Sequence, residues 1–139
     1  MAPLLELTDL GHQPVLRGAS LRLAEGERLV ISGHNGAGKS TLLRMAVGLL
    51  KPERGRVNAF GKDCRTEADF RSVRRRAGLV FQDPDDQLFC PTVAEDIAFG
   101  PLNLGKSRDE ASEIVDDVLR QLDLMVLKDR ITYKLSGGE

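Results

Sequence analysis

The chain has 139 residues, of which 41% are hydrophobic, and this is enough for one modest domain with its own core. Its 20 Lys and Arg residues balance 21 Asp and Glu residues. The chain therefore lacks the overall positive charge that would favour binding to nucleic acid or to an anionic membrane. No apolar stretch approaches the ~20 residues needed to span a bilayer, and Glu6 interrupts the apolar N-terminus, so no leader pattern is seen.

Strands dominate the first part of the chain. Residues 4–10 and 16–23 alternate apolar and polar positions, which is typical of half-buried strands. The short apolar run 29–31 predicts a buried strand, and residues 40–47 predict a helix. Between these two elements lies a glycine-rich octapeptide.

The octapeptide, residues 33–40, has the pattern G-x-x-x-x-G-K-S of a phosphate-binding loop. Its glycines let the backbone wrap a phosphate chain, so that several N–H groups point inward, and the following helix adds its free N–H groups. Lys39 is expected to reach the β- and γ-phosphates, and the Ser40 hydroxyl to hold Mg²⁺. A glycine-rich turn with a surface lysine is the alternative, but a strand before the loop and a helix after it favour binding of a nucleoside triphosphate.

Two more strands are expected at residues 56–60 and 78–81, with a helix over residues 66–76 between them. Phe70 and Val73 are the expected inward residues of that helix. It also carries four arginines that could suggest a nucleic-acid site, although a solvated helix face is the favoured interpretation. These are Arg71, Arg74, Arg75 and Arg76.

Helices dominate after residue 82. Three S/T-x-x-E patterns, at Thr92, Ser107 and Ser136, predict capping boxes that open helices. The helix after Ser107 has the clearest apolar face, formed by Ile114, Val115, Val118, Leu119 and Leu122. The fold class is therefore α/β, with a phosphate-loop core over residues 1–82 and a helical subdomain over residues 83–139.

Two further segments indicate nucleotide chemistry when taken together with the loop. Gln82 ends the predicted strand 78–81 and precedes Asp83-Pro84-Asp85-Asp86, where a neutral amide suits contact with Mg²⁺ or water. The three aspartates lack the Gly and distal Glu of a calcium loop, so a turn is expected there. The segment Ser136-Gly137-Gly138 offers a hydroxyl and bare N–H groups to a phosphate.

The ordered set G-H-N-G-A-G-K-S, F-Q-D-P-D-D-Q and L-S-G-G-E resembles the ATPase subunit of ABC transporters over essentially the whole chain. The stretch 81–101 is most similar to the importer ATPases of the cobalt/nickel and energy-coupling-factor (vitamin) type. This resemblance implies an ABC-type phosphate-loop fold with an N-terminal antiparallel β subdomain, incomplete at its C-terminus, and the cofactors ATP and Mg²⁺.

The resemblance also implies the roles of single residues. Lys39 and Gln82 are the expected catalytic residues, and Ser40 and Gln82 the expected Mg²⁺ contacts. The signature Ser136 to Gly138 is expected to bind the γ-phosphate of ATP held by the opposite subunit. The nucleotide-binding set comprises Gly33, His34, Asn35, Gly36, Ala37, Gly38, Lys39, Ser40, Thr41, Ser136, Gly137 and Gly138.

The partners that the resemblance implies are a second ATPase subunit, identical or related, and a transmembrane permease or coupling subunit contacted through residues 83–100. The chain would then be peripheral at the cytoplasmic face of the cell membrane. Leu88 and Phe89 are candidate apolar anchors for the permease, or they pack within the helical subdomain. Cys64 and Cys90 are expected to be ordinary thiols.

Two departures from the family pattern leave alternatives open. The Walker B strand, its catalytic Glu and the switch His are not found among these residues, so a nucleotide-binding remnant without turnover is the alternative function. No aromatic residue precedes the phosphate loop to stack on adenine, and the segment Gly11 to Pro14 offers only His12, which either stacks there or belongs to a plain turn. A phosphate-loop kinase is a weaker alternative, because a kinase has no use for the signature. A soluble ABC ATPase acting on ribosomes or DNA is also weaker, because the 97-residue interval from Lys39 to Ser136 shows no sign of an insertion.

Overall fold

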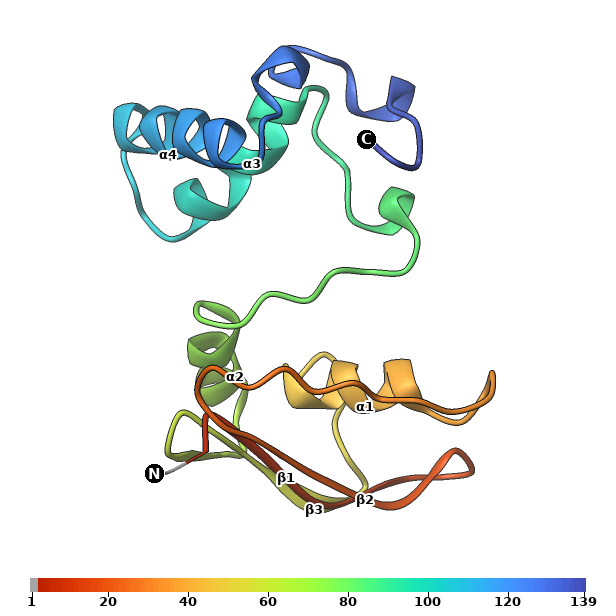
Figure 1. Ribbon diagram of the computed structural model, residues 1–139. Coiled ribbons are helices and arrows are strands. Elements are labelled where there is room, and N and C mark those ends of the chain that lie inside the picture. The colour runs from red at the N-terminus through yellow and green to blue at the C-terminus, as the bar shows by residue number, and fades with distance from the viewer. Residues whose placement is uncertain (1–2) are drawn as a thin grey trace. The chain divides into compact units, whose positions relative to one another are not determined.

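The computed structural model describes residues 3–139 and divides the chain into two compact units (Figure 1). The first unit ends at Leu79 and the second begins at Val80. Each unit has its own secondary structure and is described by itself.

A four-stranded antiparallel sheet forms the base of the first unit (Figure 1). Its strands follow the spatial order β2-β1-β3-β4. The predicted strands near residues 4–10, 16–23 and 56–60 are confirmed, whereas β4 was not predicted. The strands are β1 (Leu5–His12), β2 (Leu16–Leu23), β3 (Arg54–Ala59) and β4 (Lys62–Cys64).

Helices α1 (Lys39–Ala46) and α2 (Glu67–Arg74) lie over one face of this sheet (Figure 1). The core between them contains Leu10 and Met45, which are both fully buried. Phe70 and Val73 of α2 join the same cluster, as the helical spacing predicts. Helix α1 therefore packs on the sheet through its apolar face, and this packing fixes the position of its first turn.

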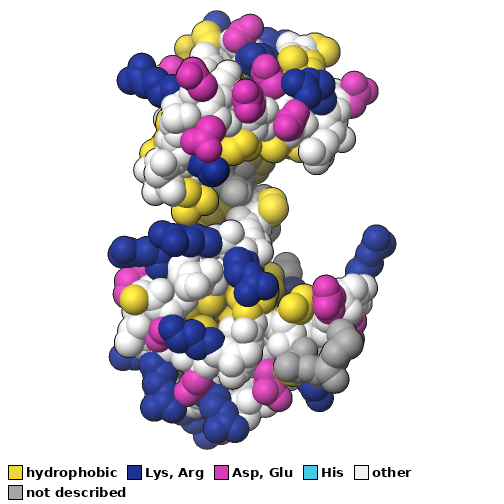
Figure 2. Space-filling view, turned by 90° about the vertical axis from the view of Figure 1, so that its left-hand side faces the viewer, with side chains coloured by type: hydrophobic (Ala, Val, Ile, Leu, Met, Phe, Trp, Pro, Cys, Tyr) yellow, Lys and Arg dark blue, Asp and Glu magenta, His cyan; other side chains and the backbone are white. Residues whose placement is uncertain are grey.

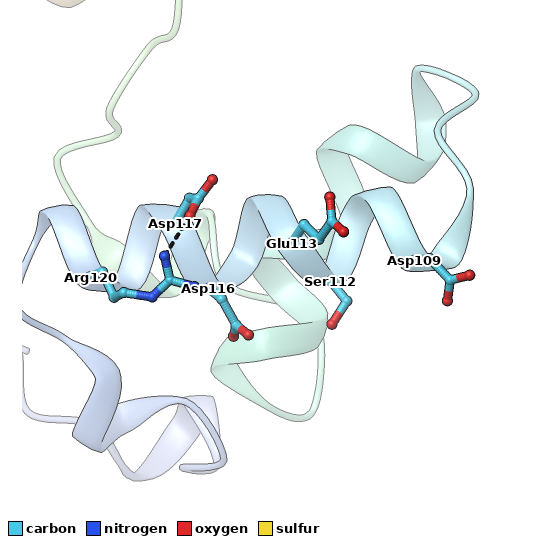
Figure 3. A pocket seen from close by; sticks show the side chains of 6 residues that line it. All are labelled: Asp109, Ser112, Glu113, Asp116, Asp117 and Arg120. Carbon is cyan, nitrogen blue, oxygen red and sulfur yellow. Dashed lines mark hydrogen bonds and ion pairs between the residues drawn. The ribbon is translucent and has the colours of Figure 1, made fainter.

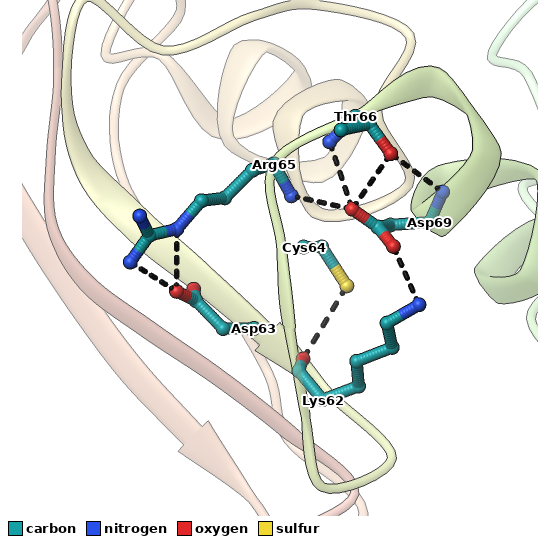
Figure 4. A network of polar contacts seen from close by, with 6 residues as sticks. All are labelled: Lys62, Asp63, Cys64, Arg65, Thr66 and Asp69. Carbon is teal, nitrogen blue, oxygen red and sulfur yellow. Dashed lines mark hydrogen bonds and ion pairs between the residues drawn. The ribbon is translucent and has the colours of Figure 1, made fainter.

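A polar network holds the start of α2 (Figure 4). The Asp69 carboxylate accepts hydrogen bonds from the Lys62 ammonium, at 2.5 Å, and from the backbone N–H groups of Thr66 and Arg65, at 2.9 and 3.1 Å. The Lys62 ammonium and these N–H groups hold the pKa of Asp69 well below its usual range. Thr66 completes a capping box with Asp69, so the helix start is fixed by its own sequence.

The arginine cluster of α2 is a solvated and partly paired surface, as predicted. Arg74 forms an ion pair with Glu67 and donates to the Val47 carbonyl oxygen at 3.0 Å. Arg76 stacks over the Phe60 ring, 3.8 Å from its centroid, while Arg71 and Arg75 are exposed.

Two expected strands are absent: residues 29–31 and 78–81 have no strand assignment. Val30 and Val80 are each 87% exposed, so these segments are also not buried. A β-strand exists only where a neighbour completes its hydrogen bonds, and within residues 3–139 no strand pairs with either segment. The apolar pattern identified segments suited to burial, but it does not show whether a neighbouring strand is present to pair with them.

The second unit is helical and is built on α3 (Val93–Asn103) and α4 (Arg108–Gln121). Short 3₁₀ turns occupy Pro84–Asp86, Met125–Leu127 and Thr132–Lys134. The predicted capping boxes at Thr92 and Ser107 are confirmed at the starts of α3 and α4.

The buried face of α4 differs slightly from the expected one. Ala111, Val115 and Leu119 are buried, whereas Leu122 is 62% exposed. The expectation for Leu122 was wrong because α4 ends at Gln121, which leaves Leu122 as the C-cap residue. On the opposite side of α4, Asp109, Glu113, Asp116 and Asp117 surround an open depression together with Ser112 and Arg120 (Figure 3). Arg120 donates to Asp117 there at 2.6 Å.

The two units carry opposite net charge. Residues 1–79 contain 14 Lys and Arg against 8 Asp and Glu, whereas residues 80–139 contain 6 against 13. Figure 2 shows many dark-blue Lys and Arg side chains over the first unit. The overall charge is near neutral because the positive net charge of the first unit and the negative net charge of the second nearly cancel. None of the helices in the described part of the chain has the length and apolar character that crossing a membrane requires.

Candidate nucleotide-binding site

The glycine-rich loop leads into the first turn of α1. Gly36 and Gly38 have φ angles of +84° and +93°, which other residues rarely adopt. The Ala37 N–H donates to the His34 carbonyl oxygen at 3.2 Å, which closes a turn inside the loop. The chain therefore doubles back just before α1 and brings the loop around the N-terminus of that helix.

Lys39 folds back over this loop. Its ammonium group donates to the carbonyl oxygens of Gly33 and His34 at 2.7 and 2.8 Å. An ammonium group has three donors, so one N–H remains for an anion. These bonds hold the positive charge at the mouth of the loop, where the sequence predicts the phosphates.

Gly38 connects the loop to the core. It is buried, and a Cβ atom at this position would lie 2.7 Å from Leu16 Cδ2 and 2.9 Å from Val15 Cγ1. The start of β2 thus packs against the last glycine of the loop. Val15 and Leu16 were not predicted as part of the site, because only the folded hairpin brings them there.

The first turn of α1 is open to an anion. Gly38 provides no side-chain cap, and the first turn has no acidic residue. The N–H groups at a helix start need acceptors, and the helix dipole makes negatively charged ones favourable. Residues 33–36 and Ser40 are exposed, so their backbone and the Ser40 hydroxyl are accessible. These features fit a phosphate chain with its Mg²⁺.

Gln82 lies in the second unit and is exposed. The turn after it is held by side chains: Asp83 Oδ1 accepts the Asp85 N–H at 3.0 Å, and Gln87 Oε1 accepts the Phe81 N–H at 3.1 Å. The expected turn at the three aspartates is therefore present as a 3₁₀ turn. Among residues 3–139, no group of three or more His, Cys, Asp or Glu could hold a metal ion.

The signature residues Ser136, Gly137 and Gly138 also lie in the second unit and are exposed. Half of the predicted capping box forms, since the Glu139 carboxylate accepts the Ser136 N–H at 2.8 Å. This bond lowers the pKa of Glu139 from its usual value. No helix begins at Ser136 in the described residues, because four residues cannot close a helical turn.

The structure thus brings together the residues of the glycine-rich loop, Gly33 to Thr41, at one site. Gln82 and the signature belong to the other unit, which is described by itself. Inside the second unit, the segment after Gln82 is tied to the segment before the signature. The Val93 and Ala94 N–H groups donate to the carbonyl oxygens of Arg130 and Lys128.

Comparison with known proteins identifies the family of the chain. The family model described as ABC transporter matches residues 16–139, and the chain therefore belongs to the ABC transporter ATP-binding family. The cobalt import ATP-binding protein CbiO of Rhodobacter capsulatus is 47% identical over the whole chain. The energy-coupling factor transporter ATP-binding protein EcfA of Methanothermobacter thermautotrophicus is 44% identical over 98% of the chain.

A solved structure supports the same fold. The structure of CbiO1 from Clostridium perfringens, described as part of the ABC transporter complex CbiONQ, matches 99% of the chain with a TM-score of 0.84 and 35% identity. The chain covers 57% of that structure, 52% of CbiO and 46% of EcfA. It therefore spans about half the length of these relatives.

Proposed function

We propose that the chain binds Mg-ATP as part of the energy-providing ATPase subunit of an ABC-type importer. The observation that carries this proposal is the loop of residues 33–40 at the start of α1, with the Lys39 ammonium held over its mouth. Backbone N–H groups and Lys39 would hold the β- and γ-phosphates, and the Ser40 hydroxyl would hold Mg²⁺. When bound, Mg²⁺ neutralises charge on the phosphate oxygens.

Gln82 and the signature are proposed to act on nucleotide from the helical unit. The exposed Gln82 amide would contact Mg²⁺ or water without adding charge. Ser136, Gly137 and Gly138 would bind the γ-phosphate of ATP held by a second ATPase subunit. Their exposure supports a role at an interface between subunits.

Residues 83–100 are proposed to contact a transmembrane permease at the cytoplasmic face of the membrane. Helix α3 is apolar in sequence, yet none of its residues is buried. Phe89 and Phe99 stack edge to face, with centroids 4.5 Å apart, although they are 65% and 43% exposed. An exposed aromatic pair of this kind is suited to an apolar partner. The relative named for cobalt import supports cobalt as the solute, and the family resemblance of residues 81–101 keeps nickel and a vitamin as the alternatives.

Calorimetric titration with Mg-ATP tests the central part of this proposal. The chain is expected to bind, and Lys39→Ala is expected to weaken binding by at least about tenfold, since it removes a charge-assisted phosphate contact. Arg28→Ala is the matched control, because Arg28 is exposed, precedes the loop and lies outside the proposed site. Equal binding by all three proteins would contradict the proposal.

We further infer that these 139 residues turn over ATP negligibly. The carboxylates that the family resemblance expects to hold Mg²⁺ and to position water, in the Walker B strand and directly after it, are not found among these 139 residues. Phosphate release is therefore expected to stay at the level of the Lys39→Ala variant. Multiple turnovers that disappear in Lys39→Ala would contradict this inference and favour full catalytic competence.

A further inference from the structure

Glu53 joins the segment that follows α1 to the connection between β1 and β2. It directly precedes β3 and so ends the segment that leaves α1. Its carboxylate oxygen Oε2 accepts the Gln13 N–H at 3.1 Å, and its own N–H donates to the Gly11 carbonyl oxygen at 2.9 Å. One residue therefore bonds both to the last part of β1 and to the turn that follows it.

His12 lies between these two positions in the chain and faces the same carboxylate. Its Nδ1 atom is shut off from solvent and lies 3.6 Å from Glu53 Oε1. The two carboxylate oxygens of Glu53 thus face two consecutive residues of the connection. The His12 carbonyl oxygen accepts the Val15 N–H at 2.9 Å, which closes the turn. A bond from a backbone N–H to a carboxylate is stronger than one to a neutral acceptor, so Glu53 stabilises this turn.

The residues after the turn pack against the phosphate loop. A Cβ atom on Gly38 would lie 2.9 Å from Val15 Cγ1 and 2.7 Å from Leu16 Cδ2. The Gly38 carbonyl oxygen accepts the Leu42 N–H at 2.8 Å, at the start of α1. A displacement of the turn would therefore change both the loop and the helix start.

These contacts close a ring within the first unit. It runs from Glu53 through the turn to Gly38, along α1, and back through the segment after α1 to Glu53. Leu42 and Met45 of α1 are buried in the core, so the helix is a fixed side of this ring. The turn cannot move away from Gly38 unless the bonds of Glu53 break or lengthen.

We propose that Glu53 is a positioning residue for the phosphate loop. It holds the β1–β2 turn against Gly38 and so keeps the loop in the shape that accepts a polyphosphate. Glu53 acts through Val15 and Leu16, not through contact with the nucleotide. A binding site needs its groups held to within about 0.5 Å, and a site that is ordered beforehand loses less entropy on binding. This inference rests on the proposed binding of Mg-ATP.

Calorimetric titration with Mg-ATP compares three forms of the chain. Glu53→Ala should bind about three- to tenfold more weakly than the native chain, because the Gln13 N–H loses its acceptor. Glu53→Gln keeps an oxygen that can accept this N–H, so it should restore most of the native affinity. Loss of one carboxylate makes the unit more positive and by itself favours an anion, so weaker binding in Glu53→Ala has no electrostatic explanation.

Two control variants separate positioning from charge and from stability. Glu25→Ala removes an exposed carboxylate of the same unit outside the ring and should bind at least as tightly as the native chain. Asp69→Asn breaks the network at the start of α2 and should lower stability without weakening Mg-ATP binding while the chain is folded. Equal affinities in Glu53→Ala and Glu25→Ala, or equal weakening in Glu53→Ala and Asp69→Asn, would overturn the proposal.

The amide signal of Gly38 in the nucleotide-free chain gives a readout that does not depend on ATP. It should move in Glu53→Ala and stay in place in Glu25→Ala, since only the first change releases the turn. An unmoved signal in Glu53→Ala would overturn the positioning role. If the native chain failed to bind Mg-ATP, the proposed function would be wrong, and this signal alone would still decide whether Glu53 sets the conformation of the loop.

Discussion

The hydroxyl group of Thr132 donates a 2.6 Å hydrogen bond to the carbonyl oxygen of Cys90, across 42 residues of the chain. Thr132 is buried, and its own N–H donates to the Pro91 carbonyl oxygen at 3.1 Å. The Asp96 carboxylate adds bonds from the Phe89 and Cys90 N–H groups. The proposed permease-contacting segment is thereby joined to the segment that leads to the signature.

Thr132→Val is expected to destabilise the helical unit by about 1–2 kcal/mol, because it keeps the shape but leaves the partly buried Cys90 carbonyl oxygen without its donor. Amide hydrogen exchange of Val93 and Ala94 should accelerate accordingly. Ser112→Ala is the control, since Ser112 is exposed on α4. Unchanged exchange in Thr132→Val would show that the bond contributes nothing to joining the two segments.

The two inner glycines of the phosphate loop should respond differently to alanine. At Gly38 the new Cβ would be 2.7 Å from Leu16, and the φ angle is +93°. At Gly36 nothing lies within 4 Å, although φ is +84°. Backbone strain costs about 1–2 kcal/mol at either site, and the collision at Gly38 adds about 1–3 kcal/mol.

Gly38→Ala should therefore lower the free energy of unfolding of the first unit clearly more than Gly36→Ala. Gly26→Ala, at φ +73° with open space around it, provides the reference for strain alone. Urea unfolding followed by circular dichroism measures the three differences. Equal losses for Gly36→Ala and Gly38→Ala would contradict the packing of Leu16 against the loop.

The Asp69 network predicts a dependence of stability on acid. The folded pKa of Asp69 lies below the ordinary value of about 3.9, so its ionised form stabilises the first unit above about pH 4. This contribution is lost as the pH falls toward the folded pKa. Asp69→Asn should be less stable than the native chain at pH 7, and the difference should narrow below about pH 4.

Thermal unfolding at a series of pH values measures this narrowing. Asp123→Asn is the control, because Asp123 is exposed in the other unit. A difference between Asp69→Asn and the native chain that stays constant from pH 7 to pH 2 would contradict the linkage.

The segment of residues 29–31 provides a further contrast. Val30 is 87% exposed, so Val30→Thr should change the free energy of unfolding by less than about 0.5 kcal/mol. Met45 is fully buried in the same unit, and Met45→Ala should cost about 2–5 kcal/mol. A large loss in Val30→Thr would mean that this segment is packed in solution as a strand.

Much of the fold could be predicted from local sequence signals. Thr66, Thr92 and Ser107 each begin a helix with a capping box, and only the latter two had been predicted from the S/T-x-x-E pattern, because Asp69 takes the place of the Glu. The alternation at residues 4–10 and 16–23 also predicted the strands β1 and β2. These features depend on residues close together in the chain, so the sequence carries them directly.

Features that depend on distant residues could not be predicted. Val30 and Val80 have the apolar pattern of strands, but a pattern does not reveal whether a neighbouring strand is present. The packing of Val15 against Gly38 and the bond from Thr132 to Cys90 likewise exist only in the folded units. The proposed roles of Gln82 and Ser136 rest on family resemblance, because both lie in a different unit from the phosphate loop.

The central claim is that the backbone of residues 33–41 and the Lys39 ammonium bind the phosphates of Mg-ATP. Titration of the ¹⁵N-labelled chain with Mg-ATP should shift the amide signals of these residues in a saturable manner. In Lys39→Ala the same shifts should need at least about tenfold more Mg-ATP, while the rest of the spectrum stays that of a folded chain. If the signals of residues 33–41 stayed unchanged at millimolar Mg-ATP in a folded chain, the claim would be wrong.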